Sequence, residues 1–473
     1  MKKNDSFLRK GGHGFLLPFI LVTVCFALWG FANDITNPLV EAFSKIFRMN
    51  VAQGALVQTA FYGGYFVMAF PAALFIRRYS YKAGVLLGLS LYAAGALLFF
   101  PAKMAGAFSF FLLAYFVLTC GLSFLETSCN PYILSMGSPA TATRRLNLAQ
   151  CFNPVGSLSG MAVAMVFIQA RLNPADMAER AQWDEATFRA VVESDLAILI
   201  RPYLWVVAVI VLLFVSLCLV RVPSVTDGAG EKKMGNREAL RRLCALPRYR
   251  EGVVAQFFYV GAQIMCWTFI IQYGKFLLMH DATAMDSALM RGAMNVLGLL
   301  DADTHRAILS APVMTEAHAA ILSQMVNIMA MAGFCLSRFA CTFLMRYISA
   351  GLLLTVFALL AGGCTLCTIV SQGITGFYAL IGISVCMSLM FPTIYGIALE
   401  GMGEEAKFGA AGLIMSILGG SVLPPLQGAI MDAGDAAGML GSLPSVNLSF
   451  VLPLVCFTVI GIYGFRIYRG RLN

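Results

Sequence analysis

Charged residues are scarce in this chain. Lys, Arg, Asp and Glu make up 12% of its 473 residues, against roughly a quarter in an ordinary soluble domain. Hydrophobic residues make up 59%. This composition excludes a water-soluble enzyme, a disordered segment and a collagen-like chain, and it indicates a protein that crosses the lipid bilayer many times.

Groups that carry enzyme chemistry are also missing. Only 4 His are present, and they do not cluster with the spacing of metal ligands. The 13 Cys are spread through apolar runs, and the one closely spaced pair, Cys364 and Cys367, has no charge nearby that would activate a thiolate. The chain has no Gly-rich phosphate loop and no catalytic triad. We therefore expect no enzyme activity, no catalytic residue, no metal and no cofactor, and we expect any transport to be driven by a gradient.

Apolar runs divide the chain into about twelve spans, each near the roughly 20 residues that cross a bilayer. A polar segment, residues 222–248, separates the sixth span from the seventh. We expect an all-α polytopic membrane protein with two six-helix bundles, residues 1–221 and 249–473, joined by this linker. The spans are expected near residues 15–46, 53–76, 83–101, 107–136, 146–170, 201–221, 250–276, 318–345, 350–370, 373–400, 407–431 and 447–468.

The distribution of Lys and Arg predicts the orientation of these spans. If the amino terminus is cytoplasmic, the cytoplasmic segments hold 22 of the 33 Lys and Arg residues and the opposite segments hold 10. By the positive-inside rule, both termini are then cytoplasmic. Topology and lipid headgroups account for the net charge of +9, so we expect no nucleic-acid partner.

Two outward segments between spans are long. Residues 171–200 mix acidic and basic side chains, which predicts a surface helix covering the bundle. Residues 277–317 contain few apolar runs and are expected to be an irregular loop, with a lid as the alternative.

Small and helix-breaking residues indicate where spans pack closely or bend. Gly156 and Gly160 have the four-residue spacing of a close contact between helices. Proline inside a span removes a backbone donor and kinks or breaks the helix. The prolines in question are Pro38, Pro131 and Pro392.

Two carboxyl groups lie deep within predicted spans, where insertion of an acid costs about 3 kcal/mol. Asp34 lies slightly outward of the centre of span one, and Glu126 lies slightly inward of the centre of span four. An acid in such a place is able to take up a proton from one side of the membrane and release it to the other. We therefore expect proton coupling through Asp34 and Glu126. The alternative is a hydrogen-bonded or ion-paired acid that only fixes helix packing.

Amide and aromatic side chains recur at helical spacings around these acids. They suit a neutral sugar, because amides pair with hydroxyl groups and aromatic rings stack on C–H faces. The alternative for any single amide is a hydrogen bond that holds two helices together in lipid. The predicted substrate-binding residues are Asn33, Asn37, Asn130, Gln150, Asn153, Tyr259, Gln263 and Trp267.

Arg338 is the one basic residue that lies deep within a predicted span. We expect it either to form an ion pair with an acid of another helix or to extend toward the cytoplasmic end of its own span.

Six segments carry distinctive motifs. They are residues 29–38 (WGFANDITNP), 58–65 (QTAFYGGY), 80–84 (SYKAG), 125–131 (LETSCNP), 145–153 (RLNLAQCFN) and 259–267 (YVGAQIMCW). In this order they resemble the fucose/proton symporter family of the major facilitator superfamily, over nearly the whole chain. The resemblance implies the major facilitator fold, alternating access, a monomer, and uptake of a hexose or deoxyhexose with a proton across the bacterial inner membrane.

The resemblance also implies roles for single residues. Glu126 matches the acid of span four in this family, and Gln150 and Asn153 match its sugar-facing amides in span five. In span one the second acid of the family falls at Asn37, whereas this chain carries Asp34 one helical turn earlier. Either Asp34 substitutes for the missing acid or Glu126 couples alone, and the sugar is L-fucose, glucose, galactose or another monosaccharide.

Three alternatives stand beside a proton-coupled monosaccharide importer. The first is a sodium-coupled or uncoupled glucose/galactose transporter. The second is an antiporter that exports a drug or metabolite, although a drug pocket would be more uniformly apolar and aromatic. The third is a sugar sensor that signals through its linker, although residues 222–248 contain no recognisable output module.

Overall fold

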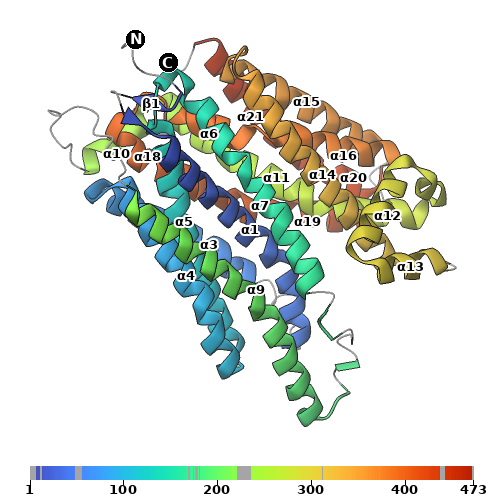
Figure 1. Cartoon of the computed structure of the whole chain (residues 1–473). Helices are drawn as coiled ribbons and strands as arrows, with labels where there is room; N and C mark the ends of the chain where they lie inside the picture. The colour runs from blue at the N-terminus through green and yellow to red at the C-terminus, as the bar shows by residue number, and fades with distance from the viewer. Residues whose placement is uncertain are drawn as a thin grey trace. The chain divides into compact units, whose positions relative to one another are not determined.

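The described part of the chain is almost entirely helical in the computed structural model (Figure 1). It comprises residues 7–10, 13–47, 56–168, 171–173, 175, 179–180, 182–220, 236–311, 313–371, 373–436 and 443–470. Two short strands, β1 (Arg9–Lys10) and β2 (His13–Gly14), form an antiparallel pair ahead of the first helix.

The helices follow one another along the chain in two runs. The first half of the chain contains α1 (Leu16–Ile46), α3 (Leu56–Arg78), α4 (Tyr81–Ala105), α5 (Phe108–Ser135), η1 (Pro139–Thr141), α6 (Ala142–Gln150), α7 (Phe152–Val163), η2 (Ala164–Ile168) and α9 (Glu185–Leu219). The second half contains α10 (Asn236–Ala245), α11 (Pro247–His280), η4 (Ala282–Asp286), α12 (Ala288–Leu300), α13 (Ala302–Ser310), α14 (Glu316–Leu344), α15 (Ala350–Val370), α16 (Ile374–Met387), α17 (Met390–Ala398), η5 (Gly403–Glu405), α18 (Ala406–Met415), η6 (Ser416–Leu418), α19 (Gly419–Ala436), α20 (Ser445–Ser449) and α21 (Val451–Tyr468).

The chain forms two compact units. Unit 1 comprises residues 1–145, 155–241 and 401–415, and unit 2 comprises residues 146–154, 242–400 and 416–473. Within unit 1, α4 packs along α5, α3 packs on α5, α9 packs on α4, and α18 packs on both α3 and α5. Within unit 2, α11 packs on α14, α19 and α21, and α15 packs on α16 and α21. The predicted domain division at residues 222–248 stays a prediction, and residues 221–235 lie outside the described part.

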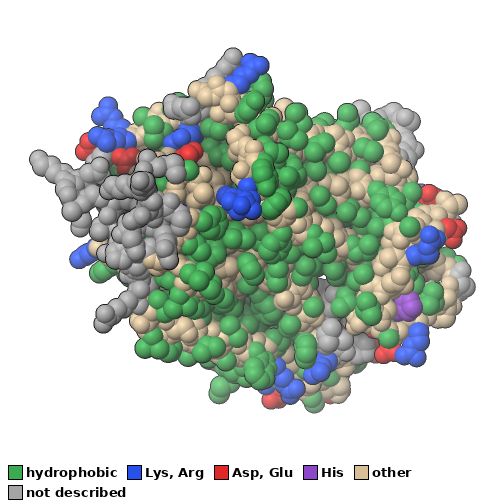
Figure 2. Space-filling view, turned by 45° about the horizontal axis from the view of Figure 1, so that its top comes forward, with side chains coloured by type: hydrophobic (Ala, Val, Ile, Leu, Met, Phe, Trp, Pro, Cys, Tyr) green, Lys and Arg blue, Asp and Glu red, His purple; other side chains and the backbone are tan. Residues whose placement is uncertain are grey.

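Eleven of the described helices are long and apolar enough to cross a membrane. They coincide with eleven of the predicted spans, so the prediction of a polytopic membrane protein is confirmed. Hydrophobic side chains spread widely over the described surface on the face seen in Figure 2, as expected of helices that face lipid. The remaining predicted span, residues 146–170, is divided among α6, α7 and η2.

Part of the segment 171–200, predicted to be a surface helix, belongs to span six. α9 begins at Glu185 and continues to Leu219 without interruption, so residues 185–200 extend this span at its amino-terminal end. Asp184 caps the helix, because its carboxylate accepts the Thr187 amide at 3.1 Å and the Thr187 hydroxyl at 2.6 Å. These hydrogen bonds hold the pKa of Asp184 below its ordinary value.

The segment 277–317 was expected to be an irregular loop, and this expectation is wrong. It contains η4, α12 and α13. α12 packs on α14 and buries Leu289, Ala293 and Leu297, which recur every four residues on one face. This helix is apolar but has only 13 residues, too few for a membrane span, which is why a search for spans does not indicate it. Its role as a lid stays a prediction.

Gly156 and Gly160 bring α7 into direct contact with α1. A methyl group at Gly156 would lie 1.9 Å from the carbonyl oxygen of Ala27. A methyl group at Gly160 would lie 2.6 Å from the carbonyl oxygen of Phe31. The close helix contact predicted from the spacing of these glycines is therefore confirmed.

Of the prolines that were expected to kink or break their spans, two lie within continuous helices and one lies beside a break. α1 continues through Pro38, and α5 continues through Pro131. Span ten is broken as predicted, because α16 ends at Met387 and α17 begins at Met390, two residues before Pro392.

Candidate functional site

Asp34 lies on α1, on the side where α7 approaches. Its side chain is half-buried, and Ser157 lies within hydrogen-bonding reach of its carboxyl group. The Ser157 hydroxyl also donates to the carbonyl of Gly30 at 3.3 Å. The neighbouring Asn33 keeps its Oδ1 atom buried without a partner among the described residues. Polar groups therefore gather at the contact between α1 and α7.

Glu126 lies on α5 and is 5% exposed. Tyr65 of α3 donates its hydroxyl hydrogen to Oε1 of Glu126 at 3.4 Å. The other carboxyl oxygen, Oε2, is buried and has no partner in the described part of the chain. Since a buried acceptor without a donor is costly, a proton on Oε2 relieves the cost that an unpaired carboxylate oxygen would carry. The carboxyl group thus has one anchored oxygen and one that is able to carry a proton.

Two tyrosines of α3 lie near the two acids. Tyr65 donates to Glu126, and Tyr62 lies one helical turn earlier, close enough for the charge of Asp34 to act on its phenol group. The hydroxyl of Ser123 donates to the carbonyl of Tyr65 at 3.1 Å and holds this part of α3 against α5. Sequence reasoning did not predict either tyrosine as a site residue. The available signal was their three-residue spacing, which places two phenol groups on one face of a helix.

Asn37 on α1 and Asn130 on α5 were also predicted to bind the sugar. Asn130 is fully buried, and its side-chain amide donates to the carbonyl of Glu126 in the preceding turn at 3.0 Å. This bond lies within α5, so it does not join two helices. The side chain of Asn37 lies outside the described part. A sugar contact of Asn130 or Asn37 therefore stays a prediction.

Gln150 and Asn153 flank the first break in span five. α6 ends at Gln150, and α7 begins two residues later at Phe152. Gln150 is 4% exposed, and Asn153 is half-buried. Transporters commonly build substrate sites from interrupted helices, because a break places side chains and carbonyl groups toward one cavity. The break therefore suits the two amides predicted to bind sugar.

The three predicted residues of span seven lie along α11. Tyr259 is fully buried, and its hydroxyl donates to the carbonyl of Met387 at 3.2 Å. Trp267 is half-buried, and its indole N–H donates to the hydroxyl of Ser384 at 3.3 Å. Gln263 is half-buried between them. Both aromatic residues are thus held against α16 by hydrogen bonds.

Asn327 of α14 is a site candidate that sequence reasoning missed. Its side-chain amide donates to the carbonyl of Trp267 at 3.2 Å, and its Oδ1 atom is buried without a described partner. The ring of Trp267 also packs edge-on against Phe334, with ring centroids 5.2 Å apart. The signal that would have indicated Asn327 is its three-residue spacing from Gln324 on one helix face.

Arg338 lies on α14 and is 2% exposed. No acid among the described residues forms an ion pair with it, so the expected ion pair is not found there. Instead, Nη1 donates to the carbonyl of Gln150 at 3.0 Å, and Nε donates to the carbonyl of Ser388. The guanidinium group also lies over the ring of Phe334, 4.4 Å from its centroid. Backbone carbonyls take the place of the expected carboxylate because two helices are interrupted beside this arginine.

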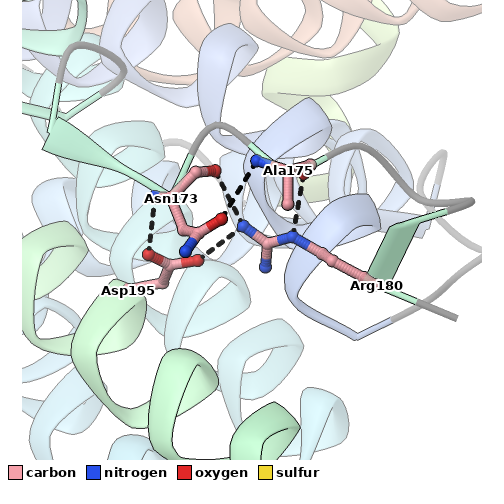
Figure 3. A network of polar contacts seen from close by, with 4 residues as sticks. All are labelled: Asn173, Ala175, Arg180 and Asp195. Carbon is pink, nitrogen blue, oxygen red and sulfur yellow. Dashed lines mark hydrogen bonds and ion pairs between the residues drawn. The ribbon is translucent and has the colours of Figure 1, made fainter. Parts of the chain in front are cut away.

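A separate polar network fixes the connection between η2 and α9. Nη2 of Arg180 lies 2.9 Å from Oδ2 of Asp195, and the two side chains are 1% and 2% exposed (Figure 3). The same Nη2 donates to the carbonyl of Asn173 at 2.9 Å, and Nε donates to the carbonyl of Ala175 at 3.0 Å. Oδ1 of Asp195 accepts the amide of Asn173 at 3.0 Å. The connection between η2 and α9 is thereby tied to the first three turns of α9.

Replacing Asp195 by alanine is expected to lower the unfolding free energy by about 3 kcal/mol, because Arg180 would remain buried with an uncompensated charge. The measurement is the thermal midpoint of the purified protein in detergent. Glu185→Ala is the matched control, because its ion pair with Arg189 has side chains 67% and 78% exposed and should add no measurable stability. Equal thermal midpoints for the two variants would contradict a stabilising role of the buried ion pair between Arg180 and Asp195.

The candidate residues comprise two buried or half-buried acids and a set of amides and aromatic rings, which suits a neutral polyol and a proton. Among the described residues, no group of three or more His, Cys, Asp or Glu is placed to hold a metal ion.

Comparisons with known proteins agree with this chemistry. The family model of the Major Facilitator Superfamily matches residues 22–425. An L-fucose-proton symporter of Haemophilus influenzae is 47% identical over 96% of this chain and 97% of its own length. The L-fucose-proton symporter of Escherichia coli is 30% identical over 95% of this chain and 92% of its own length.

One further relative and one solved structure are also similar to this chain. A glucose/galactose transporter of Brucella abortus is 29% identical over 96% of this chain and 94% of its own length. The crystal structure of FucP, a major facilitator transporter in the outward conformation, matches with a TM-score of 0.79 and 29% identity over 95% of this chain and 98% of that chain. The predicted all-α major facilitator fold is confirmed by this match.

Proposed function

Because the chain belongs to the major facilitator superfamily, we propose that it is a proton-coupled importer of a monosaccharide that works by alternating access. L-fucose is the favoured substrate, since the relative that shares 47% identity is named an L-fucose-proton symporter. The protein is accordingly a carrier and not an enzyme. The segment 222–248 is proposed to be a cytoplasmic linker between domains formed by residues 1–221 and 249–473.

The observation that carries the proposal is the environment of Glu126. One oxygen of this acid accepts a hydrogen bond from Tyr65, and the other is buried without a described partner. Such an acid is stable when protonated and becomes costly when it loses its proton in the same surroundings. Proton release therefore has to accompany a change of surroundings, which alternating access supplies. Asp34, beside Ser157, is proposed as a second proton-coupling residue that takes the place of the acid missing at Asn37.

The sugar is proposed to lie against amides and aromatic rings. Amides meet its hydroxyl groups, and the indole and phenol rings meet its C–H faces. The proposed contacts are Asn33, Asn37, Asn130, Gln150, Asn153, Tyr259, Gln263 and Trp267.

The proposed setting is the inner membrane of a bacterium. Relatives at 47% and 30% identity come from bacteria, and the excess of Lys and Arg on one side favours cytoplasmic termini. The functional unit is proposed to be a monomer surrounded by lipid, with the sugar and the proton as its ligands.

A second candidate is transport of glucose or galactose, coupled to sodium or uncoupled. The glucose/galactose transporter of Brucella abortus, at 29% identity, favours it. The amide at position 37, where the fucose-type pattern has an acid, favours it as well.

The test is the pH of a lightly buffered, energy-depleted suspension of cells that produce the protein. Pulses of L-fucose, galactose, glucose and a non-sugar control are added, and labelled sugar uptake is measured in parallel. We expect alkalinisation with L-fucose, because protons enter with the sugar. Cells without the protein are the control.

Each other outcome favours a different function. Sugar entry without alkalinisation would favour sodium-coupled or uncoupled transport. Binding without entry would favour a sensor. If no sugar bound or entered, export of a drug or metabolite by antiport would become the better proposal.

A further inference from the structure

Spans five and ten are each interrupted a few residues before a proline, Pro154 in span five and Pro392 in span ten. In a continuous helix the amide of one residue bonds the carbonyl of the residue four positions earlier, and proline has no amide hydrogen. Pro154 therefore leaves the carbonyl of Gln150 without its helical donor, and Pro392 does the same for Ser388. The helices end at these places, since α6 ends at Gln150 and α16 ends at Met387.

Arg338 supplies a donor to both carbonyls. Its Nη1 donates to Gln150 at 3.0 Å, and its Nε donates to Ser388. These are charge-assisted hydrogen bonds from one rigid, planar group, and they lie in a region where Arg338 is 2% exposed. Since an unpaired buried carbonyl is costly, the arginine stabilises two breaks at once.

Two other backbone carbonyls at the break in span ten accept hydrogen bonds from α11 and α14. The carbonyl of Met387 accepts from Tyr259 at 3.2 Å, and the carbonyl of Val385 accepts from Ser337 at 2.9 Å. The hydroxyl of Ser388 donates to that of Ser337 at 2.9 Å. The position of span ten relative to Arg338 is therefore fixed by several bonds.

Other contacts at the break in span five include one with α17 and one with α14. Nδ2 of Asn147 donates to Oγ1 of Thr393 at 3.3 Å, and Sγ of Cys151 lies 3.5 Å from Oγ1 of Thr342. These neutral contacts are weaker than a charge-assisted bond. Arg338 is consequently the strongest of these three ties on the segment that carries Gln150 and Asn153.

We propose that Arg338 is a positioning residue for sugar binding: by bridging the carbonyls that Pro154 and Pro392 leave without helical donors, it sets the place of the segment from Gln150 to Asn153. The inference rests on the proposed function, because it takes this segment as a sugar contact. Arg338 itself does not touch the sugar. Loss of the bridge misplaces the two amides and weakens sugar binding more than it slows turnover.

The first test is Arg338→Met, which keeps much of the length of the side chain and removes its donors. We expect the KM for sugar to rise about tenfold, with a smaller change in maximal rate. Arg338→Lys is expected to behave like Arg338→Met, because an ammonium group lacks the planar fork that reaches two carbonyls. Full recovery by lysine would overturn the proposal and assign Arg338 a role as a charge alone.

The second test adds Pro154→Ala, which returns an amide hydrogen to the carbonyl of Gln150. The double variant Arg338→Met, Pro154→Ala is expected to have a KM well below that of Arg338→Met, within about threefold of Pro154→Ala alone. Pro101→Ala is the matched control, because Pro101 lies exposed within α4 and should give no rescue. Rescue by both alanine substitutions, or by neither, would overturn the proposal.

Thermal midpoints without sugar separate this inference from the proposed function. Arg338→Met is expected to lower the midpoint, and Pro154→Ala is expected to restore part of it, whichever sugar is carried. If Arg338→Met does not fold, recovery of folded protein in the double variant becomes the same test. A wild-type protein that carries no sugar would refute the proposed function, while failure of the rescue in a working transporter would refute the role of Arg338.

Discussion

Cells that produce the Glu126→Gln variant are expected to take up sugar without alkalinising the medium and without accumulating it above the external concentration. Glutamine keeps the size of the side chain and still accepts a hydrogen bond from Tyr65, whose hydroxyl lies 3.4 Å from Oε1. It cannot release a proton. The measurement is the steady-state ratio of internal to external labelled sugar, together with medium pH. Exchange of sugar across the membrane should survive, because the polar groups proposed to bind sugar are unchanged.

Three variants serve as controls for this result. Glu126→Asp keeps an acid and should keep accumulation, at a lower rate, because the carboxyl group moves away from Tyr65. Tyr65→Phe removes the donor to Oε1 and should alter the pH dependence of uptake while leaving sugar accumulation in place. Asp34→Asn decides between the two coupling schemes, since accumulation is retained if Glu126 couples alone and lost if Asp34 takes part. Sustained accumulation with proton uptake in Glu126→Gln would contradict the coupling role of Glu126.

The long spans could be predicted because the membrane imposes a local requirement on the sequence. A helix that faces lipid needs about 20 apolar residues, and this requirement is visible without any knowledge of neighbouring helices. The division of residues 146–170 into α6, α7 and η2 does not follow from hydropathy. The break between α6 and α7 lies beside Pro154, and Arg338 of another helix donates to the carbonyl of Gln150 at this break.

Some candidate site residues could be predicted because the membrane also restricts where charged residues occur. Asp34 and Glu126 are conspicuous because a charge in lipid is costly, and the deep position of Arg338 is conspicuous for the same reason. The partners of Arg338 could not be predicted, because every residue has a backbone carbonyl and the sequence does not indicate which of them accepts a hydrogen bond. They become visible only when the structure brings the residues four positions before two prolines to one guanidinium group.

Gly156→Leu is expected to abolish the folded transporter, and Gly156→Ala is expected to lower the unfolding free energy by about 3 kcal/mol. Even a methyl group at this position would lie 1.9 Å from the carbonyl oxygen of Ala27 and 2.7 Å from its carbonyl carbon. These are backbone atoms, so no change of rotamer relieves the overlap, and α7 has to move away from α1. The measurement is the yield of monodisperse protein in detergent and its thermal midpoint.

The matched control is Gly363→Ala, because no atom lies within 4 Å of a methyl group at that exposed position of α15. Its midpoint should equal or exceed that of the wild type, since alanine favours a helix over glycine. A wild-type midpoint for Gly156→Ala would contradict the close contact of α1 and α7. The contact also bears on transport, because Ser157 follows Gly156 and lies within reach of Asp34. A folded Gly156→Ala protein should therefore carry less sugar per molecule than the wild type, as α7 draws Ser157 away from that acid.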